Sequence, residues 1–137
     1  MFNRLTRARE TLAPLTPGRV AVYTCGPNLQ RPLQMAEARR FVMADLLCRY
    51  LRWRGLRVTW VMNLTDIDDK IIRGAAAQGI THTELADHYT ARFLTDMDSL
   101  GVTRPDVLPR ATEHIPQIVD LVATLVEMGH AYATDDG

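Results

Sequence analysis

The sequence predicts an α/β fold with a small, mainly parallel sheet, a crossover helix and further helices towards the C-terminus. The segments Arg19–Thr24 and Val58–Leu64 are rich in β-branched residues and have the length of strands. Between them, apolar residues of Ala38–Arg54 recur at helical spacing. A strand, helix and strand in this order join two parallel strands. Such a unit binds nucleotides at the carboxyl ends of its strands, provided that the first turn suits phosphate.

Length and composition restrict the class of protein. A chain of 137 residues allows one domain with a real core and is short for two. Its 47% hydrophobic and 23% charged content is typical of a soluble globular protein. No apolar run is long enough to span a membrane and no leader opens the chain, so we expect no membrane contact and a cytoplasmic location. The two cysteines, Cys25 and Cys48, form no CxxC pair, which argues against a zinc knuckle or disulfide framework.

The first half of the chain supplies most of the predicted core. Residues 2–15 are expected to form a short strand or extended segment and then a loop. The helix of Ala38–Arg54 has a narrow polar stripe of Asp45, Arg49 and Arg52, so we expect most of it to be covered. Its apolar positions are Phe41, Val42, Leu46, Tyr50 and Trp53. Trp53 and Trp60 are predicted core residues, although an exposed Trp53 would indicate a partner surface.

Three more helices follow in the predicted order. The first covers Asp66–Gln78, with Thr65 or Asp66 as its N-cap. Thr81 and Glu84 form a capping box for the next, which ends at Gly101. Its apolar face is predicted to hold Leu85, Tyr89, Phe93, Met97 and Leu100. After a proline-containing loop at Thr103–Pro109, the last helix covers Thr112–Met128 and has a broad apolar side. So few strands leave an open sheet edge, and we expect a homodimer or another protein partner to cover it.

Charge is balanced overall but unevenly distributed. The formal net charge is zero, and Lys70 is the only lysine among sixteen basic residues. Seven arginines between Arg31 and Arg57 stand against Glu37 and Asp45, a local excess of five positive charges. This segment could attract nucleic acid such as tRNA, but a solvated helix face is the favoured interpretation.

The residues along the whole chain resemble the N-terminal part of cysteinyl-tRNA synthetases, which are class I aminoacyl-tRNA synthetases. The similarity is most specific in the string Asn-Leu-Thr-Asp-Ile-Asp-Asp-Lys of residues 63–70. Further matches are Phe2-Asn3-x-Leu5-Thr6-Arg7, Tyr23-x-Cys25-Gly26-Pro27, Ala38-Arg39-x-Phe41-Val42, Arg104-Pro105-Asp106 and Pro109-Arg110-Ala111-Thr112-Glu113-His114-Ile115. The resemblance implies half of a class I Rossmann-like (HUP) catalytic domain. Residues 1–137 would form a single domain, with 1–110 as the Rossmann-like half and 111–137 as the start of an insertion region.

One departure from the family concerns ATP. The family signature His-Ile-Gly-Asn or His-Ile-Gly-His, which holds the ATP phosphates, is replaced by Gln34, Met35, Ala36 and Glu37. Gln34 cannot become cationic, and Ala36 adds a methyl group where the nucleotide approaches. Glu37 sets a carboxylate at the helix N-terminus, where a phosphate would bind. This degenerate signature leaves the catalytic residues unknown and makes ATP a cofactor by resemblance only.

The resemblance also implies roles around the amino-acid pocket and zinc. Cys25, Gly26, Thr65 and Asp66 are the predicted substrate-binding residues. Cys25 matches the first of the family's zinc ligands, but three further ligands and the lysine-rich loop of the family's later half have no counterpart in these 137 residues. The residues themselves therefore predict no cofactor, and zinc, like ATP, is implied by the resemblance only. From the sequence itself, Cys25 is favoured as a small buried residue at a strand end rather than a metal ligand or reactive thiol.

These observations lead to three hypotheses for function. The first is a truncated cysteinyl-tRNA synthetase-like paralogue that does not adenylate cysteine or charge tRNA alone and acts by binding a ligand or a protein. The second is a cysteine- and ATP-dependent ligase, or a subunit of one that another chain completes. The third is a tRNA-binding accessory protein that uses the arginines of Arg39–Arg57.

Overall fold

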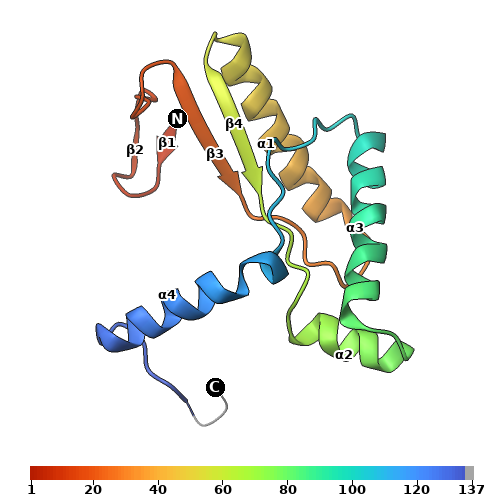
Figure 1. Cartoon of the computed structure of the whole chain (residues 1–137). Helices are drawn as coiled ribbons and strands as arrows, with labels where there is room; N and C mark the ends of the chain where they lie inside the picture. The colour runs from red at the N-terminus through yellow and green to blue at the C-terminus, as the bar shows by residue number, and fades with distance from the viewer. Residues whose placement is uncertain (135–137) are drawn as a thin grey trace.

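The computed structural model describes residues 1–134, and residues 135–137 of the predicted domain lie outside the described part. It confirms the α/β class, with parallel strands in a small sheet and four α-helices (Figure 1). The elements are β1 (Phe2–Asn3), β2 (Ala8–Arg9), β3 (Arg19–Thr24), α1 (Met35–Trp53), β4 (Arg57–Met62), α2 (Asp69–Gln78), α3 (His82–Ser99), the 3₁₀-helix η1 (Ala111–His114) and α4 (Ile115–Glu127). No helix in the described part of the chain is both long and apolar enough to cross a bilayer.

The sheet is built on a parallel pair. β3 and β4 run in register from the pair Arg19–Arg57 to the pair Thr24–Met62, and β1 and β2 form a separate antiparallel hairpin. The predicted loop at Thr103–Pro109 is confirmed, because no helix or strand is assigned there, and from Asp106 it follows the side of β4 opposite β3. Met62 N–H donates to the Val107 carbonyl at 3.0 Å and Leu64 N–H to the Pro109 carbonyl at 2.8 Å. Pro109 has no N–H, which prevents a regular ladder there.

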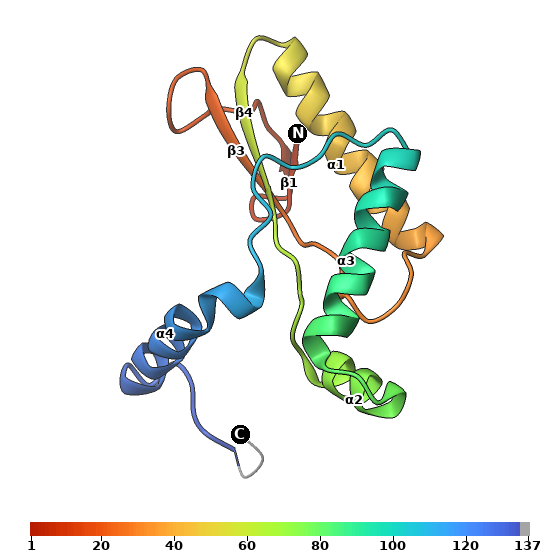
Figure 2. The ribbon, with the colours of Figure 1, turned by 45° about the vertical axis from the view of Figure 1, so that its right-hand side comes forward.

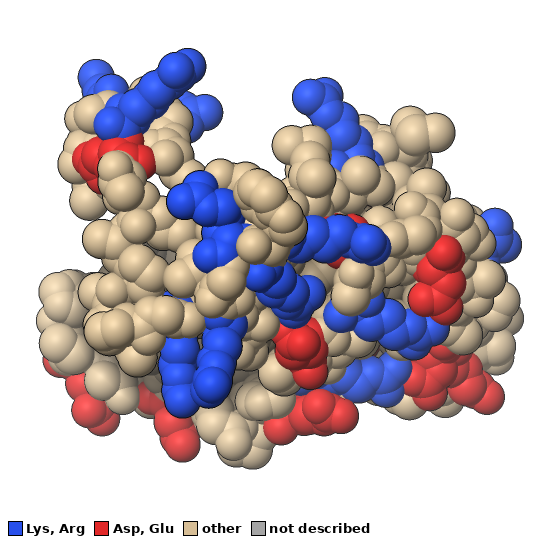
Figure 3. Space-filling view, turned by 90° about the horizontal axis from the view of Figure 1, so that it is seen from above, with Lys and Arg blue, Asp and Glu red and all other residues tan. Residues whose placement is uncertain are grey.

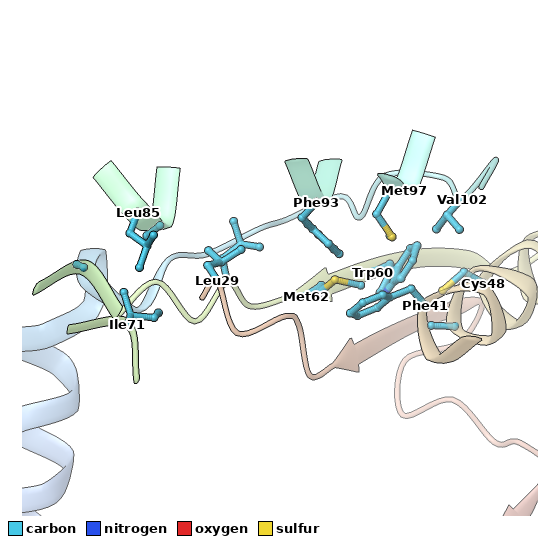
Figure 4. Packing of buried hydrophobic residues seen from close by; sticks show 14 residues of the cluster. Leu29, Phe41, Cys48, Trp60, Met62, Ile71, Leu85, Phe93, Met97 and Val102 are labelled. Carbon is cyan, nitrogen blue, oxygen red and sulfur yellow. The ribbon is translucent and has the colours of Figure 1, made fainter. Parts of the chain in front are cut away.

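The core lies between β4, α1 and α3. Trp60 and Met62 of β4 are fully buried against Phe41 and Cys48 of α1, and α3 closes the layer from the other side (Figure 4). The rings of Phe41 and Phe93 meet edge to face, with centroids 5.2 Å apart. Trp60 is therefore a core residue, as predicted, and its Nε1–H donates to Thr24 Oγ1 at 2.9 Å, which joins β4 to β3.

α1 differs from its predicted burial. It begins at Met35 rather than Ala38, and its buried residues are Ala38, Phe41, Ala44, Asp45, Cys48 and Leu51. The predicted core residue Trp53 is 78% exposed, so that prediction is wrong, as is the expectation that most of the helix is covered. Asp45, expected on a solvated stripe, is buried because it accepts hydrogen bonds from Arg49 Nε at 2.7 Å and Thr103 N–H at 3.2 Å.

The later helices follow the sequence more closely. Thr81 and Glu84 form the predicted capping box of α3, with Thr81 N–H donating to Glu84 Oε2 at 2.8 Å. On the predicted apolar face, Leu85 and Phe93 are buried, whereas Leu100 is exposed. α2 begins at Asp69, later than predicted. α4 extends away from the rest of the molecule in both ribbon views (Figure 2).

Candidate functional site

The carboxyl ends of β3 and β4 are held together by a tight turn at Gly26. Gly26 N–H donates to Asn63 Oδ1 at 3.0 Å. A Cβ atom at Gly26 would lie 1.6 Å from the backbone oxygen of Asn63, so no larger residue fits without a backbone shift. The predicted substrate-binding residue Gly26 thus lies where the carboxyl ends of the two strands meet, and its own role in the structure is close backbone packing.

Asn63 connects the segments that meet at this end of the sheet. Its Oδ1 accepts a second hydrogen bond from the Tyr23 hydroxyl at 3.0 Å, and its Nδ2 donates to Thr65 Oγ1 at 3.2 Å. The side chain therefore connects β3, the Gly26 turn and the segment after β4. Asn63 is not among the predicted site residues, although its place as the first polar residue after β4 is the kind of signal that marks such a position.

Thr65 and Asp66 point to different surroundings. The Thr65 carbonyl accepts from Leu29 N–H at 3.1 Å, which keeps Thr65 beside the turn after β3. Asp66 is 2% exposed and accepts from Thr112 N–H at 3.0 Å and Thr112 Oγ1 at 2.6 Å. Arg110 Nε lies 3.7 Å from the Asp66 carboxylate. Asp66 thus anchors the start of η1, and its ligand-binding role stays a prediction.

The N-cap of α2 is Asp68 rather than Thr65 or Asp66. Its Oδ1 accepts from Ile71 N–H at 2.8 Å, which is the cap bond that fixes where the helix begins. The other carboxylate oxygen accepts from Asn28 Nδ2. This leaves Asn28 Oδ1 as a buried acceptor without a hydrogen-bond partner among the described residues.

In the segment predicted to be a degenerate signature, Gln34–Glu37, a carboxylate of the protein itself lies at the N-terminus of α1. Glu37 Oε2 accepts from Gln34 N–H at 3.1 Å. Arg31 donates to the same carboxylate through its two terminal guanidinium nitrogens, Nη1 to Oε2 at 3.0 Å and Nη2 to Oε1 at 3.1 Å. Arg31 was not predicted as a site residue. The only signal for it in the sequence is a basic residue shortly before the acidic first turn of a helix.

Electrostatics keep this carboxylate charged. Partial burial alone would raise the pKa of Glu37, but the hydrogen bonds from Arg31 and Gln34 N–H outweigh it and lower the pKa below its usual value. The end of the helix dipole that attracts anions is therefore occupied by an ionised side chain. Met35 and Ala36 lie exposed beside it, and neither offers a side-chain donor.

Cys25 is exposed, so the favoured interpretation as a small buried residue is wrong. The strand ends at Thr24, and the turn carries the next side chain outward rather than into the core. Buried Cys48 has a raised pKa, chiefly because burial disfavours its thiolate. Within residues 1–134, no three side chains of His, Cys, Asp or Glu gather closely enough to hold a metal ion. In that range, Cys25 alone does not fit a zinc site.

Some arginines of the arginine-rich segment form ion pairs within the chain. Figure 3 shows basic side chains across the middle of one face, with acidic groups towards one side. Arg49 pairs with Asp45 at 2.7 Å, and Arg52 pairs with Asp106 at 2.9 Å. The tRNA-binding role of these arginines stays a prediction.

Comparisons with known proteins place this geometry in a family. Residues 11–137 match the model for the tRNA synthetase class I (C) catalytic domain. Over all 137 residues the chain is 45% identical to a cysteine–tRNA ligase of Maridesulfovibrio salexigens and 42% identical to one of Mannheimia succiniciproducens. It spans 28% and 30% of the lengths of these relatives.

A solved structure shows the same fold. The methionyl-tRNA synthetase of Mycobacterium tuberculosis, in complex with methionyl-adenylate, superposes with a TM-score of 0.64 at 20% identity. The similarity covers 69% of this chain and 18% of that one. Because the family model matches nearly the whole sequence, the chain belongs to the class I tRNA synthetase (C) catalytic-domain family.

Proposed function

We propose that this chain is a cysteinyl-tRNA synthetase-like paralogue that works by binding a ligand or a protein and does not by itself adenylate cysteine or charge tRNA. The observation that carries the proposal is the carboxylate of Glu37 at the N-terminus of α1, held there by Arg31 and Gln34 N–H. In a fold of this kind, that helix end is the place where phosphate groups bind.

The size of the electrostatic effect supports this proposal. A phosphate charge about 4 Å from the Glu37 carboxylate would be repelled by about 1 kcal/mol in water and about 4 kcal/mol at an intermediate dielectric. The competing ion pair is partly exposed, with 40% of the Arg31 side chain and 29% of the Glu37 side chain accessible. Pairs of this exposure contribute at most about 1 kcal/mol. The positive charge of Arg31 therefore offsets part of the repulsion that the Glu37 carboxylate exerts on a phosphate, and it supplies no donor in place of the missing ones.

The missing donors matter as well. Stabilising the charge that develops on a transferring phosphoryl or adenylyl group requires positioned donors, and removing one typically costs about 100- to 1,000-fold in rate. Gln34 provides a neutral amide in place of an imidazole, and Ala36 occupies the close-approach position with a methyl group. The loss of these donors affects the chemical step, so it supports a role in binding rather than in catalysis.

Exchange between ATP and pyrophosphate in the presence of cysteine tests the proposal directly. The purified 137-residue chain is expected to give no cysteine-dependent exchange above background, with the cysteine–tRNA ligase of Maridesulfovibrio salexigens as the positive control. The proposal would be contradicted if the purified chain catalysed this exchange and the Gln34→Ala variant did not. That result would place catalysis at the altered signature.

Removing the charge of Glu37 is expected to strengthen ATP binding. The Glu37→Gln variant keeps a side chain of the same size and loses the repulsion, so the dissociation constant for ATP should fall about fivefold in the solvent-exposed limit. Isothermal titration calorimetry measures this change. Glu113→Gln, an exposed acid on η1, is the matched control and should leave the affinity unchanged. Equal ATP affinity of the Glu37→Gln variant and the unaltered chain would show that the carboxylate is not the obstacle.

A further inference from the structure

Two aromatic side chains are exposed next to each other at the C-terminal end of α1. Tyr50 and Trp53 are 47% and 78% exposed, and their ring centroids lie 5.9 Å apart with 34° between the ring planes. The core does not account for these rings, because α1 buries its opposite side, with Phe41 and Cys48, against β4 and α3. Neighbouring large rings that remain in solvent indicate a surface for a binding partner.

Arg54 adds a positive charge directly beside this pair. Its Nη1 donates to the Tyr50 hydroxyl at 2.9 Å. Its guanidinium carbon lies 5.9 Å from the centroid of the Tyr50 ring, within the range of a cation–π contact. These contacts order Tyr50 and leave the ring of Trp53, the last residue of α1, as the most exposed part of the group.

The turn after α1 brings two more arginines to the same end of the molecule. Leu56 N–H donates to the Leu51 carbonyl at 3.1 Å, which folds the chain back on the helix just before β4. Arg57 begins β4 and is paired in register with Arg19, the first residue of β3. Neighbouring strands are about 4.8 Å apart, so these two arginines lie side by side. We call the five residues at this end the aromatic–arginine surface: Arg19, Tyr50, Trp53, Arg54 and Arg57.

The positive charge of this surface is not neutralised by the chain. Within residues 1–134, no carboxylate forms an ion pair with Arg19, Arg54 or Arg57, whereas Arg49 and Arg52 are both paired. The sequence has no acidic residue from 11 to 36 or from 46 to 65, the segments that build this end. Figure 3 looks onto the end of the molecule where α1 finishes and β4 begins, and basic side chains cross its middle. The surface therefore favours an anionic partner.

Positive charge beside exposed rings fits a single-stranded nucleic acid. Arginines pair with its phosphates, and its unpaired bases stack on aromatic side chains and guanidinium planes. A duplex keeps its bases within its own stack, and an acidic peptide has carboxylates but no bases, so neither uses both features. We propose that the aromatic–arginine surface binds single-stranded nucleic acid, with a base stacked on Trp53 and phosphates along Arg54, Arg57 and Arg19.

This surface is separate from the site at the N-terminus of α1. Trp53 and Glu37 are 16 residues apart on one helix, which places them about 24 Å from each other along its axis. Arg19 and Arg57 begin the strands whose carboxyl ends meet at Gly26, about 17 Å away. Nucleic-acid binding at this end thus goes beyond the proposed function, and either proposal can fail without the other.

Tryptophan fluorescence tests the stacking. The chain has two tryptophans, and Trp60 is 0% exposed, so quenching by an oligouridylate of about ten nucleotides reports on Trp53. We expect saturable quenching, and the anisotropy of a labelled oligouridylate gives the dissociation constant. Trp53→Ala should weaken binding at least about fivefold, whereas Trp53→Phe keeps a ring that stacks and should retain most of the affinity. Tyr132→Ala, at a position 84% exposed, is the matched control and should leave the affinity unchanged.

The salt dependence of binding tests the arginines. Three phosphate contacts predict that affinity falls about 20-fold between about 50 mM and about 200 mM salt. Replacing Arg54 and Arg57 together with glutamine leaves one contact, and the loss over the same range should shrink to about threefold. Arg73→Gln removes the same charge from an exposed position on α2 and should keep the steep dependence. All these positions are exposed, so circular dichroism should show an unchanged fold.

Three results would overturn the proposal. The first is an absence of quenching and of anisotropy change at the lower salt concentration. The second is an unchanged affinity of the Trp53→Ala variant, which would show that no base stacks on this ring. The third is equal affinity for polyglutamate or for duplex RNA, because the surface would then select charge alone or a protein partner.

Discussion

Replacing Gly26 with alanine is expected to lower the free energy of unfolding by about 3–4 kcal/mol, at the large end of single substitutions. The new Cβ atom would lie 1.6 Å from the backbone oxygen of Asn63 and 2.8 Å from its carbonyl carbon. Backbone cannot yield as a flexible side chain can, so the turn after β3 must move away from β4. That movement also strains the bond from Gly26 N–H to Asn63 Oδ1.

Thermal unfolding followed by circular dichroism measures this effect. For a chain of this length we expect the melting temperature to fall by roughly 10–15 °C. Gly74→Ala is the matched control: Gly74 lies in α2, where the nearest atom to an added Cβ is Leu85 Cδ2 at 3.4 Å, and alanine favours helix. The control should be neutral or slightly stabilising. If both variants melted at the temperature of the unaltered chain, the close approach of Gly26 to Asn63 would be refuted.

Asp66→Ala is expected to cost about 2–3 kcal/mol of stability. The carboxylate is 2% exposed and accepts two hydrogen bonds from Thr112, with Arg110 close by. Removing it leaves the backbone N–H and the hydroxyl of Thr112 without their acceptor in a part-buried place, and donors left unsatisfied in this way are costly. The connection between β4 and η1 should loosen first, because these bonds join them directly.

Urea denaturation gives the free energy, and hydrogen exchange at Thr112 N–H shows where the structure loosens. Thr112→Ser is the matched control, because it keeps the hydroxyl donor and should change stability by less than about 1 kcal/mol. Asp69→Ala, at an exposed position on the first turn of α2, controls for the general loss of a carboxylate. A loss for Asp69→Ala as large as that for Asp66→Ala would mean that the buried bonds of Asp66 contribute little.

The strand–helix–strand unit was predictable because its pattern is local. The β-branched run of β4 and the capping box of α3 identify their elements without any tertiary information, and the structure confirms both. The burial of α1 was not predictable in the same way. Periodicity shows that a helix has an apolar face but not which of two apolar faces a neighbouring element covers, and here α3 covers the face of Phe41 and leaves that of Trp53 open.

The candidate site was also predictable from the sequence only in part. The altered signature at Gln34–Glu37 is visible in the sequence, and so is the acidic group that it introduces at a helix N-terminus. The bidentate contact from Arg31 to Glu37 depends on the path of the loop between β3 and α1, which residue types alone do not specify. The same holds for Asn63, because the hydrogen bonds that it accepts from Tyr23 and Gly26 form only when both strands and the Gly26 turn are in place.

The sequence by itself determined the fold class and the family, because these depend on residue identity and short-range spacing. Only the tertiary structure decided that Cys25 is exposed, that Asp66 anchors η1 and that α1 and α4 present apolar faces to solvent. Each of these outcomes depends on which segments distant in sequence pack together. That packing depends on all the contacts of the core together, so no local sequence pattern specifies which segments meet.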